Sequence, residues 1–222
     1  MTKLRLLFST AVMLAVTSAS AAHASNNPTM DAEVARIGNQ WAHIKYQVNG
    51  KGAQLAQIEA LAVQAAEVVK RYPGRAEPLI WDGIVTSEEA ALASPFHQLA
   101  LANTARKIFE QAQSIDPKAL GGGAPMSLGV LYYRVPGFPI GFGNNARAQQ
   151  YLEAALAVDP AGLDANYFYG DFLMSKGEPA KARAYLQRAL QAPADPARPV
   201  WDAGRRGEVR ELLAKADQQA AH

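Results

Sequence analysis

The sequence predicts an all-α fold, a solenoid of irregular helical hairpins that ends in a C-terminal capping helix. Apolar residues recur at helical spacing through most of residues 31–222. No run of alternating β-branched residues is long enough to form a strand. One pattern of small and large residues also recurs along the chain, and a proline follows each copy. These three observations together favour stacked helix pairs.

The N-terminal segment predicts export. Lys3 and Arg5 form a short basic region, residues 6–16 are apolar, and Ala22-His23-Ala24 resembles a cleavage site. The apolar run is short for a membrane span, and an uncleaved anchor helix is the alternative. We expect a signal peptide over residues 1–24, a disordered leader over 25–30 and the repeat domain over 31–222. The expected location is the periplasm, without stable membrane insertion after cleavage.

Composition excludes several classes of function. The chain has 22 basic and 20 acidic side chains, and two of the basic ones lie in the expected signal peptide, so the remainder is formally neutral. A neutral domain has no electrostatic basis for binding nucleic acid. The absence of cysteine excludes disulfides, thiol catalysis and zinc–thiolate sites.

Helices are predicted near residues 31–48, 53–71, 77–93, 96–115, 124–134, 144–158, 163–176, 178–191 and 199–219. The repeated pattern reads small, large, large, small at positions i, i+3, i+4 and i+7, which lie on one helical face. Its three copies are Ala105, Ile108, Phe109, Ala112; Ala148, Tyr151, Leu152, Ala155; and Ala182, Tyr185, Leu186, Ala189. The small residues allow a neighbouring helix to approach closely.

A glycine in the preceding helix accompanies each copy of this pattern. Gly170 lies twelve residues before Ala182, which is the usual spacing. Gly129 lies nineteen residues before its alanine and Gly83 twenty-two, so seven and ten residues are extra there. Prolines at positions 73, 117, 160 and 193 give spacings of 44, 43 and 33, near the 34-residue period of one helical repeat class.

The last predicted helix has an apolar stripe and a charged back. The stripe consists of Val209, Leu212, Leu213 and Ala216, and a terminal helix of this kind closes a solenoid. Arg205 and Arg206 are accompanied by Glu208 and Glu211, so they are interpreted as surface ion pairs.

These residues resemble a tetratricopeptide repeat (TPR) protein over roughly residues 53–193, most clearly over 124–193. The stretches 131–143 and 164–171 also resemble exported bacterial TPR proteins similar to the T component of TRAP transporters. That resemblance implies a helical periplasmic protein that binds protein or small ligands without catalysis. The chain lacks the cysteine that attaches many T components to lipid.

The extra residues before Ala148 form a shaped loop, 135–143, with two prolines, three glycines and four apolar side chains. Phe138, Ile140 and Phe142 either fold back and plug a gap between helices, or they form a lip over a groove or a contact for another chain. The plug is the more ordinary outcome for aromatic side chains.

Aromatic and polar residues gather on the predicted first helices, which line the concave face of a solenoid. The candidate binding residues, including two from the loop, are Tyr132, Tyr133, Arg134, Phe138, Phe142, Asn166, Tyr167, Tyr169 and Asp171. Arg134 and Asp171 could orient a polar ligand or pair with each other. Alternatively, Tyr132 and Tyr169 belong to the core and the charged pair ties two repeats together.

No catalytic or cofactor site is expected. His43, His97 and His222 are widely separated, and Gly121-Gly122-Gly123 lacks the Lys-Ser/Thr of a phosphate loop, so it is interpreted as a flexible connection. The sequence therefore predicts a non-enzymatic periplasmic module without cofactors or metals. It would bind a peptide or partner helix on its concave face. The alternative is a small-molecule-binding accessory protein of a transport system.

Overall fold

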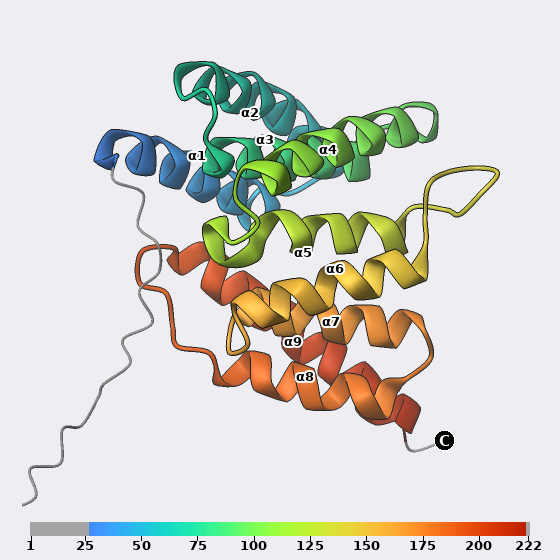
Figure 1. The fold of residues 1–222 in the computed structure, drawn as a ribbon. Coiled ribbons are helices and arrows are strands. Elements are labelled where there is room, and N and C mark those ends of the chain that lie inside the picture. The colour runs from blue at the N-terminus through green and yellow to red at the C-terminus, as the bar shows by residue number, and fades with distance from the viewer. Residues whose placement is uncertain (1–26, 221–222) are drawn as a thin grey trace, which may run out of the picture.

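The computed structural model describes residues 27–220, which form nine α-helices (Figure 1). They are α1 (Pro28–Gln47), α2 (Lys51–Arg71), α3 (Ala76–Leu92), α4 (Pro95–Ile115), α5 (Ala119–Arg134), α6 (Asn145–Val158), α7 (Leu163–Ser175), α8 (Pro179–Gln191) and α9 (Pro199–Ala220). The predicted all-α hairpin solenoid is confirmed. The expected signal peptide and the first leader residues lie outside the described part of the chain.

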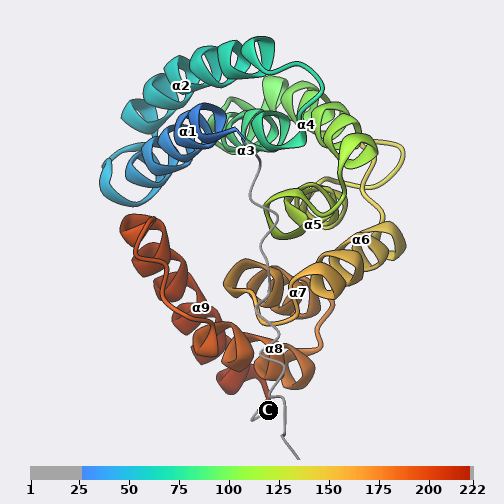
Figure 2. The ribbon, with the colours of Figure 1, turned by 60° about the vertical axis from the view of Figure 1, so that its left-hand side comes forward.

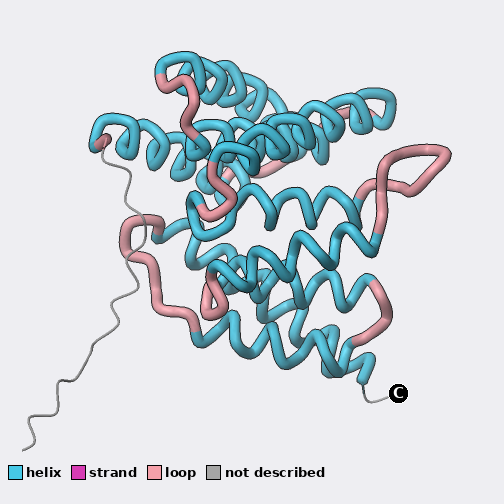
Figure 3. Tube along the Cα trace, viewed as in Figure 1, coloured by secondary structure: helices cyan, strands magenta, loops and turns pink. Residues whose placement is uncertain are grey.

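The helices stack as four antiparallel hairpins, α1/α2, α3/α4, α5/α6 and α7/α8, and α9 packs on α8. The odd-numbered helices form an inner layer and the even-numbered helices an outer one (Figure 2). Short connections join most of them, and the segment between α5 and α6 projects farthest (Figure 3). The inner helices therefore face a common interior.

Three hairpins close through the same contact. A Cβ atom added to Gly83 would lie 2.5 Å from the Phe109 ring, and equivalent atoms on Gly129 and Gly170 would lie 2.6 and 2.8 Å from Leu152 and Leu186. Only glycine permits this approach between the paired helices. The alanines at the start of the repeated pattern, Ala105, Ala148 and Ala182, are fully buried beside it.

The extra residues of the two stretched repeats take different forms. The ten near Gly83 lengthen the helices, since α3 has 17 residues, α4 has 21 and only Ala93 and Ser94 separate them. The seven near Gly129 remain as the loop before α6. The sequence located both insertions but could not assign their structure.

The N-terminus of α1 corrects the expected leader. The helix begins at Pro28, three residues before the predicted start. The Asn27 side chain accepts a hydrogen bond from the Met30 amide at 3.1 Å, and Met30 is fully buried. An N-cap, a proline at the first helical position and a buried anchor together start a helix here.

The glycine run near the start of α5 forms a tight left-handed turn within the helix rather than a flexible connection. Leu120, Gly121 and Gly122 have φ values of 49°, 66° and 80°, in the left-handed region. A Cβ atom on Gly122 would lie 3.3 Å from the Ala155 Cα of α6. Glycine therefore serves both the backbone conformation and the close contact with the next helix.

The terminal helix closes the solenoid on itself, because α9 packs against α1 and α7 as well as α8 (Figure 2). Val209 and Ala216 of the predicted stripe are fully buried. At the seam with α1, a Cβ atom on Gly204 would lie 2.5 Å from the Tyr46 ring, whose hydroxyl donates to Glu208 at 3.2 Å. The described helices therefore form a ring.

Arg205 and Arg206 are corrected from surface ion pairs to structural residues. Arg205 is only 4 % exposed. Arg206 donates to the carbonyls of Leu190 and Ala192 at 3.1 and 2.8 Å and so caps the C-terminus of α8. Arg206 is held by the terminal carbonyls of α8, and Arg205 is buried by the closure of the ring.

None of the helices in residues 27–220 is long and apolar enough to cross a membrane.

Candidate functional site

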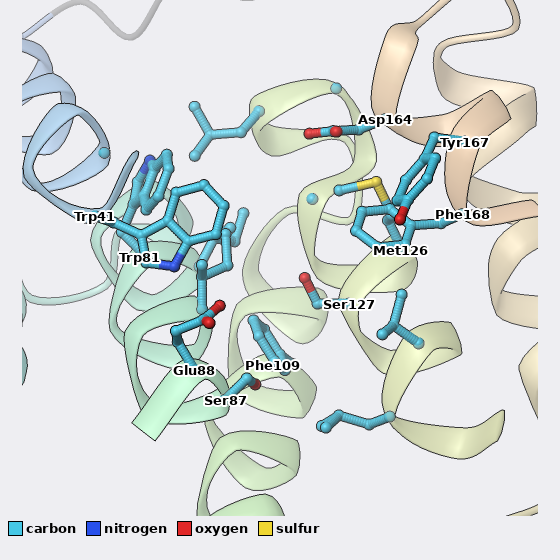
Figure 4. A pocket seen from close by; sticks show the side chains of 18 of the residues that line it. Trp41, Trp81, Ser87, Glu88, Phe109, Met126, Ser127, Asp164, Tyr167 and Phe168 are labelled. Carbon is cyan, nitrogen blue, oxygen red and sulfur yellow. The ribbon is translucent and has the colours of Figure 1, made fainter. Parts of the chain in front are cut away.

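A cavity of about 1610 Å³ lies inside the ring (Figure 4). The inner helices α1, α3, α5, α7 and α9 supply most of its lining. The sequence prediction that first helices line the concave face agrees with this arrangement. The terminal helix α9 adds a wall that the repeat pattern did not indicate.

Aromatic side chains face each other across this cavity. Trp41 of α1 and Trp81 of α3 pack edge to face with ring centroids 5.9 Å apart. Tyr167 and Phe168 of α7 lie on the opposite side, and Ser127 of α5 points into the space between the two groups (Figure 4). The walls of the cavity are therefore mostly apolar, and polar side chains lie among them, as is common in ligand sites.

A chain of charges runs along one wall, from α3 through α1 and α9 to α7. Lys45 Nζ lies 3.4 Å from Glu88 Oε2 and 3.9 Å from Glu208 Oε1. Glu208 also pairs with Arg205, whose Nε lies 2.6 Å from Asp164 Oδ1. These residues all line the cavity, and their ion pairs join the first hairpin to the last helix.

Arg205 is the buried centre of this charged chain. Its guanidinium stacks on the rings of Tyr167 and Phe168, with 4.6 Å to each centroid. Burial alone would lower the pKa of Arg205, but Asp164 and Glu208 outweigh it and keep the group charged. The paired guanidinium thus orders part of the aromatic wall.

Arg134, at the C-terminus of α5, also lines the cavity, and the structure pairs it with Asp171. Its Nη2 lies 2.5 Å from Asp171 Oδ2, and the Tyr133 hydroxyl donates to the same oxygen at 2.5 Å. Burial raises the pKa of Tyr133, so the phenol remains a donor. Of the candidate binding residues in the helices, Arg134 and Tyr167 reach the cavity, and Tyr133 and Asp171 hold Arg134 in place.

The structure places three other candidates in supporting positions. Tyr132 is 1 % exposed and stacks on Tyr151 with centroids 5.6 Å apart. Asn166 is fully buried and donates to the carbonyls of Pro160 and Gly162, and Tyr169 donates to Glu153. These side chains pack behind the residues that line the cavity and do not line it themselves.

The loop 135–143 divides between the two interpretations made from sequence. Phe142 folds back, edge to face with Tyr132 and beneath the Arg106 guanidinium, 4.5 Å from its ring centroid. Phe138 and Ile140 are instead 94 % and 70 % exposed. The plug interpretation is therefore right for Phe142 and wrong for the loop tip.

Several lining residues were not singled out from the sequence, namely Trp41, Trp81, Met126, Ser127, Phe168 and Trp201. The two tryptophans on α1 and α3 could have been found by applying the first-helix rule to the N-terminal helices. Trp201 could not, since α9 lies outside the repeat pattern. All three tryptophans of the chain line this one cavity.

The described residues offer no metal centre, because no group of three or more His, Asp or Glu side chains is placed to hold an ion. The lining of the cavity is mostly apolar and contains paired charges.

The described helices form a helical-hairpin solenoid around the cavity, and residues 140–199 match the model of the tetratricopeptide repeat family. A crystal structure of TTC0263, a thermophilic TPR protein in Thermus thermophilus, is similar to this chain with a TM-score of 0.55 and 14 % identity. The similarity covers 84 % of this chain and 98 % of that one. It shows the same fold.

A crystal structure of MamA protein has 17 % identity and a TM-score of 0.43, covering 85 % of this chain and 92 % of that one. No curated protein matches the chain in sequence. The comparisons do not support the finer resemblance to T components of TRAP transporters.

Proposed function

We propose that this protein is a non-enzymatic interaction module that binds a polypeptide segment inside its ring. One observation carries the proposal: the inner helices and α9 enclose an apolar, aromatic-lined cavity of about 1610 Å³. TPR-type solenoids present such an inner surface to extended or helical partners. The partner segment would carry apolar side chains between the Trp41–Trp81 and Tyr167–Phe168 walls.

The size of the cavity favours a polypeptide over a single small ligand. Small-molecule sites usually measure about 300–1,000 Å³. A helix about 11 Å wide that rises 1.5 Å per residue would fill this cavity with roughly ten residues. The occupant is therefore a peptide segment or one partner helix of about three turns.

The proposed location is the periplasm. Its support is the basic, apolar and small-residue order of residues 1–24. Expression with and without these residues, followed by osmotic release and mass spectrometry of the N-terminus, tests it. A released chain that begins at Ser25 is expected, and a chain that stays with the cytosol and keeps Met1 contradicts it.

Blocking the cavity tests the binding proposal. Peptides are selected from a displayed random 16-residue library on the wild-type chain, and the best one is labelled for fluorescence anisotropy. Ser127→Arg places a long charged side chain between the aromatic walls, and we expect it to abolish binding. Ser114→Arg makes the same substitution at an exposed position outside the lining and is expected to bind normally.

A selected peptide that binds Ser127→Arg as tightly as wild type overturns the cavity proposal. The tryptophan emission gives a second reading, because all three tryptophans line the cavity and an occupant must alter their surroundings.

The second candidate function is a small-molecule-binding accessory of a transport system. It is favoured by the position of the 135–143 loop, because Val135, Pro136 and Ile140 line the cavity. A thermal-shift screen against organic acids and amino acids distinguishes it from peptide binding. A ligand of the native state raises the melting temperature, and no shift at millimolar concentration removes this candidate.

A further inference from the structure

We infer that Phe96, Phe138 and Ile140 form an apolar rim at one mouth of the cavity, and that this rim grips the same polypeptide partner as it leaves the ring. The inference rests on the proposed function and extends it. The partner must then be longer than the cavity, with apolar side chains that continue past its end.

The three rim residues are the most exposed large apolar side chains in residues 27–220. Phe96 is 93 % exposed, Phe138 94 % and Ile140 70 %. Single exposed apolar residues are ordinary, but a group of them marks a contact surface. We therefore ask whether the three exposed side chains belong to one surface.

The loop and the start of α4 lie together. A Cβ atom on Gly141 would be 3.3 Å from the Leu99 side chain, and Leu99 follows Phe96 by three residues on the same helix. Residues three apart share a helical face. The loop tip thus extends the apolar surface that begins at the N-terminus of α4.

The frame of the loop is fixed. The amides of Ile140 and Gly141 both donate to the Gly137 carbonyl at 3.1 Å, and the Gly143 amide donates to Pro136 at 2.9 Å. A Cβ atom on Gly143 would lie 1.9 Å from the Val135 carbonyl oxygen, so only glycine fits. Phe142 anchors the base against Tyr132. Because this backbone is already ordered, a partner that binds the exposed side chains of the loop pays less conformational entropy.

The rim is continuous with the cavity. Ile140 belongs to both surfaces, and Pro95 and Leu99 of α4 line the cavity beside Phe96. The loop leaves the C-terminal end of α5 (Figure 1), and Arg134 at that end also lines the cavity. A segment bound between the aromatic walls would therefore meet the rim on leaving at this end.

The test uses the displayed-library peptide described above and three variants of the full chain. Phe138→Asp/Ile140→Asp places charges on the rim, where both side chains are exposed and the fold does not depend on them. Val63→Asp is the matched control, an equally apolar residue that is 66 % exposed on α2 of the outer layer. Ser127→Arg tests whether the peptide binds inside the cavity. Circular dichroism and melting temperature check that each variant is folded.

We expect the rim double variant to weaken peptide binding more than tenfold, with Val63→Asp unchanged and Ser127→Arg inactive. Truncating the peptide to its central ten residues should remove the difference between wild type and the rim variant. Equal binding by wild type and the rim variant, with Ser127→Arg inactive, overturns the rim and leaves the cavity proposal standing. Normal binding by Ser127→Arg overturns both.

Discussion

Asp82 is a half-buried carboxylate on α3 that no described residue compensates. Burial alone raises its pKa from 3.8 to about 6, and its backbone carbonyl, not its carboxylate, accepts the Thr86 hydroxyl. A carboxyl group whose pKa is higher in the folded state binds protons more tightly there than in the unfolded chain. It therefore costs no stability below pH 4, and its cost grows until the pH exceeds about 6.

Asp82→Asn should stabilise the protein in a pH-dependent way. We expect the free energy of unfolding at pH 7.5 to rise by about 1–2 kcal/mol, since partial exposure screens part of the shift. At pH 4 the variant and wild type should differ little. Urea denaturation at both pH values measures this. A stabilisation that is equal at pH 4 and pH 7.5 would contradict a titrating cause.

At the scale of the helices, one packing device unites hairpins of unequal length. Gly83, Gly129 and Gly170 each meet the large side chain four residues after a buried alanine. The contact is the same whether the extra residues lengthen the helices, as in α3/α4, or form a loop, as in α5/α6. The packing of each hairpin therefore depends on the point where its two helices cross, and the lengths of the helices and of their connection can vary.

Two glycine substitutions separate packing from helix propensity. Gly129→Ala should destabilise the protein by about 1–3 kcal/mol, because the new methyl group would overlap Leu152. Gly207→Ala on α9 meets no atom within 4 Å and should stabilise by up to about 1 kcal/mol. Thermal and urea denaturation compare the two. Similar effects of the two substitutions would remove the proposed packing role of the hairpin glycines.

For the whole molecule, the seam between α1 and α9 decides whether the solenoid is a ring or an open arc. Its contacts include the Tyr46 ring against Gly204, the hydrogen bond from the Tyr46 hydroxyl to Glu208 and the ion pair of Lys45 with Glu208. No covalent connection reinforces this seam, in contrast to each hairpin. The cavity and its charged wall both depend on its closure.

A disulfide across the seam tests closure in a chain that has no cysteine of its own. The Gly204 Cβ position lies 2.5 Å from the Tyr46 ring, so the two Cα atoms lie within about 6.5 Å, a span that a disulfide allows. Tyr46→Cys/Gly204→Cys should oxidise within one chain. Oxidation should then raise its stability by about 2–4 kcal/mol over its own reduced form.

Tyr46→Cys alone serves as the control for loss of the aromatic ring. Double-variant chains that remain reduced under mild oxidation, or that crosslink only between molecules, would show that α1 and α9 are apart in solution.

The sequence by itself determined the helices and, for the pairs α3/α4, α5/α6 and α7/α8, the residues that close each pair. These features are local: periodicity places apolar faces, prolines and capping residues end helices, and glycine and alanine mark close approaches. Arg134 and Tyr167 were also found this way, because their helices belong to recognisable repeats.

Only the tertiary structure decided what the repeats enclose. The return of α9 to α1 places Trp201 in one cavity with residues more than a hundred positions earlier, and Arg205 is buried beside Asp164 of α7. The outward position of Phe138 and Ile140 was equally undetermined, since the loop composition fits a plug as well as a lip. Closure of the ring depends on the summed rotation of successive hairpins, and no local sequence pattern contains that sum.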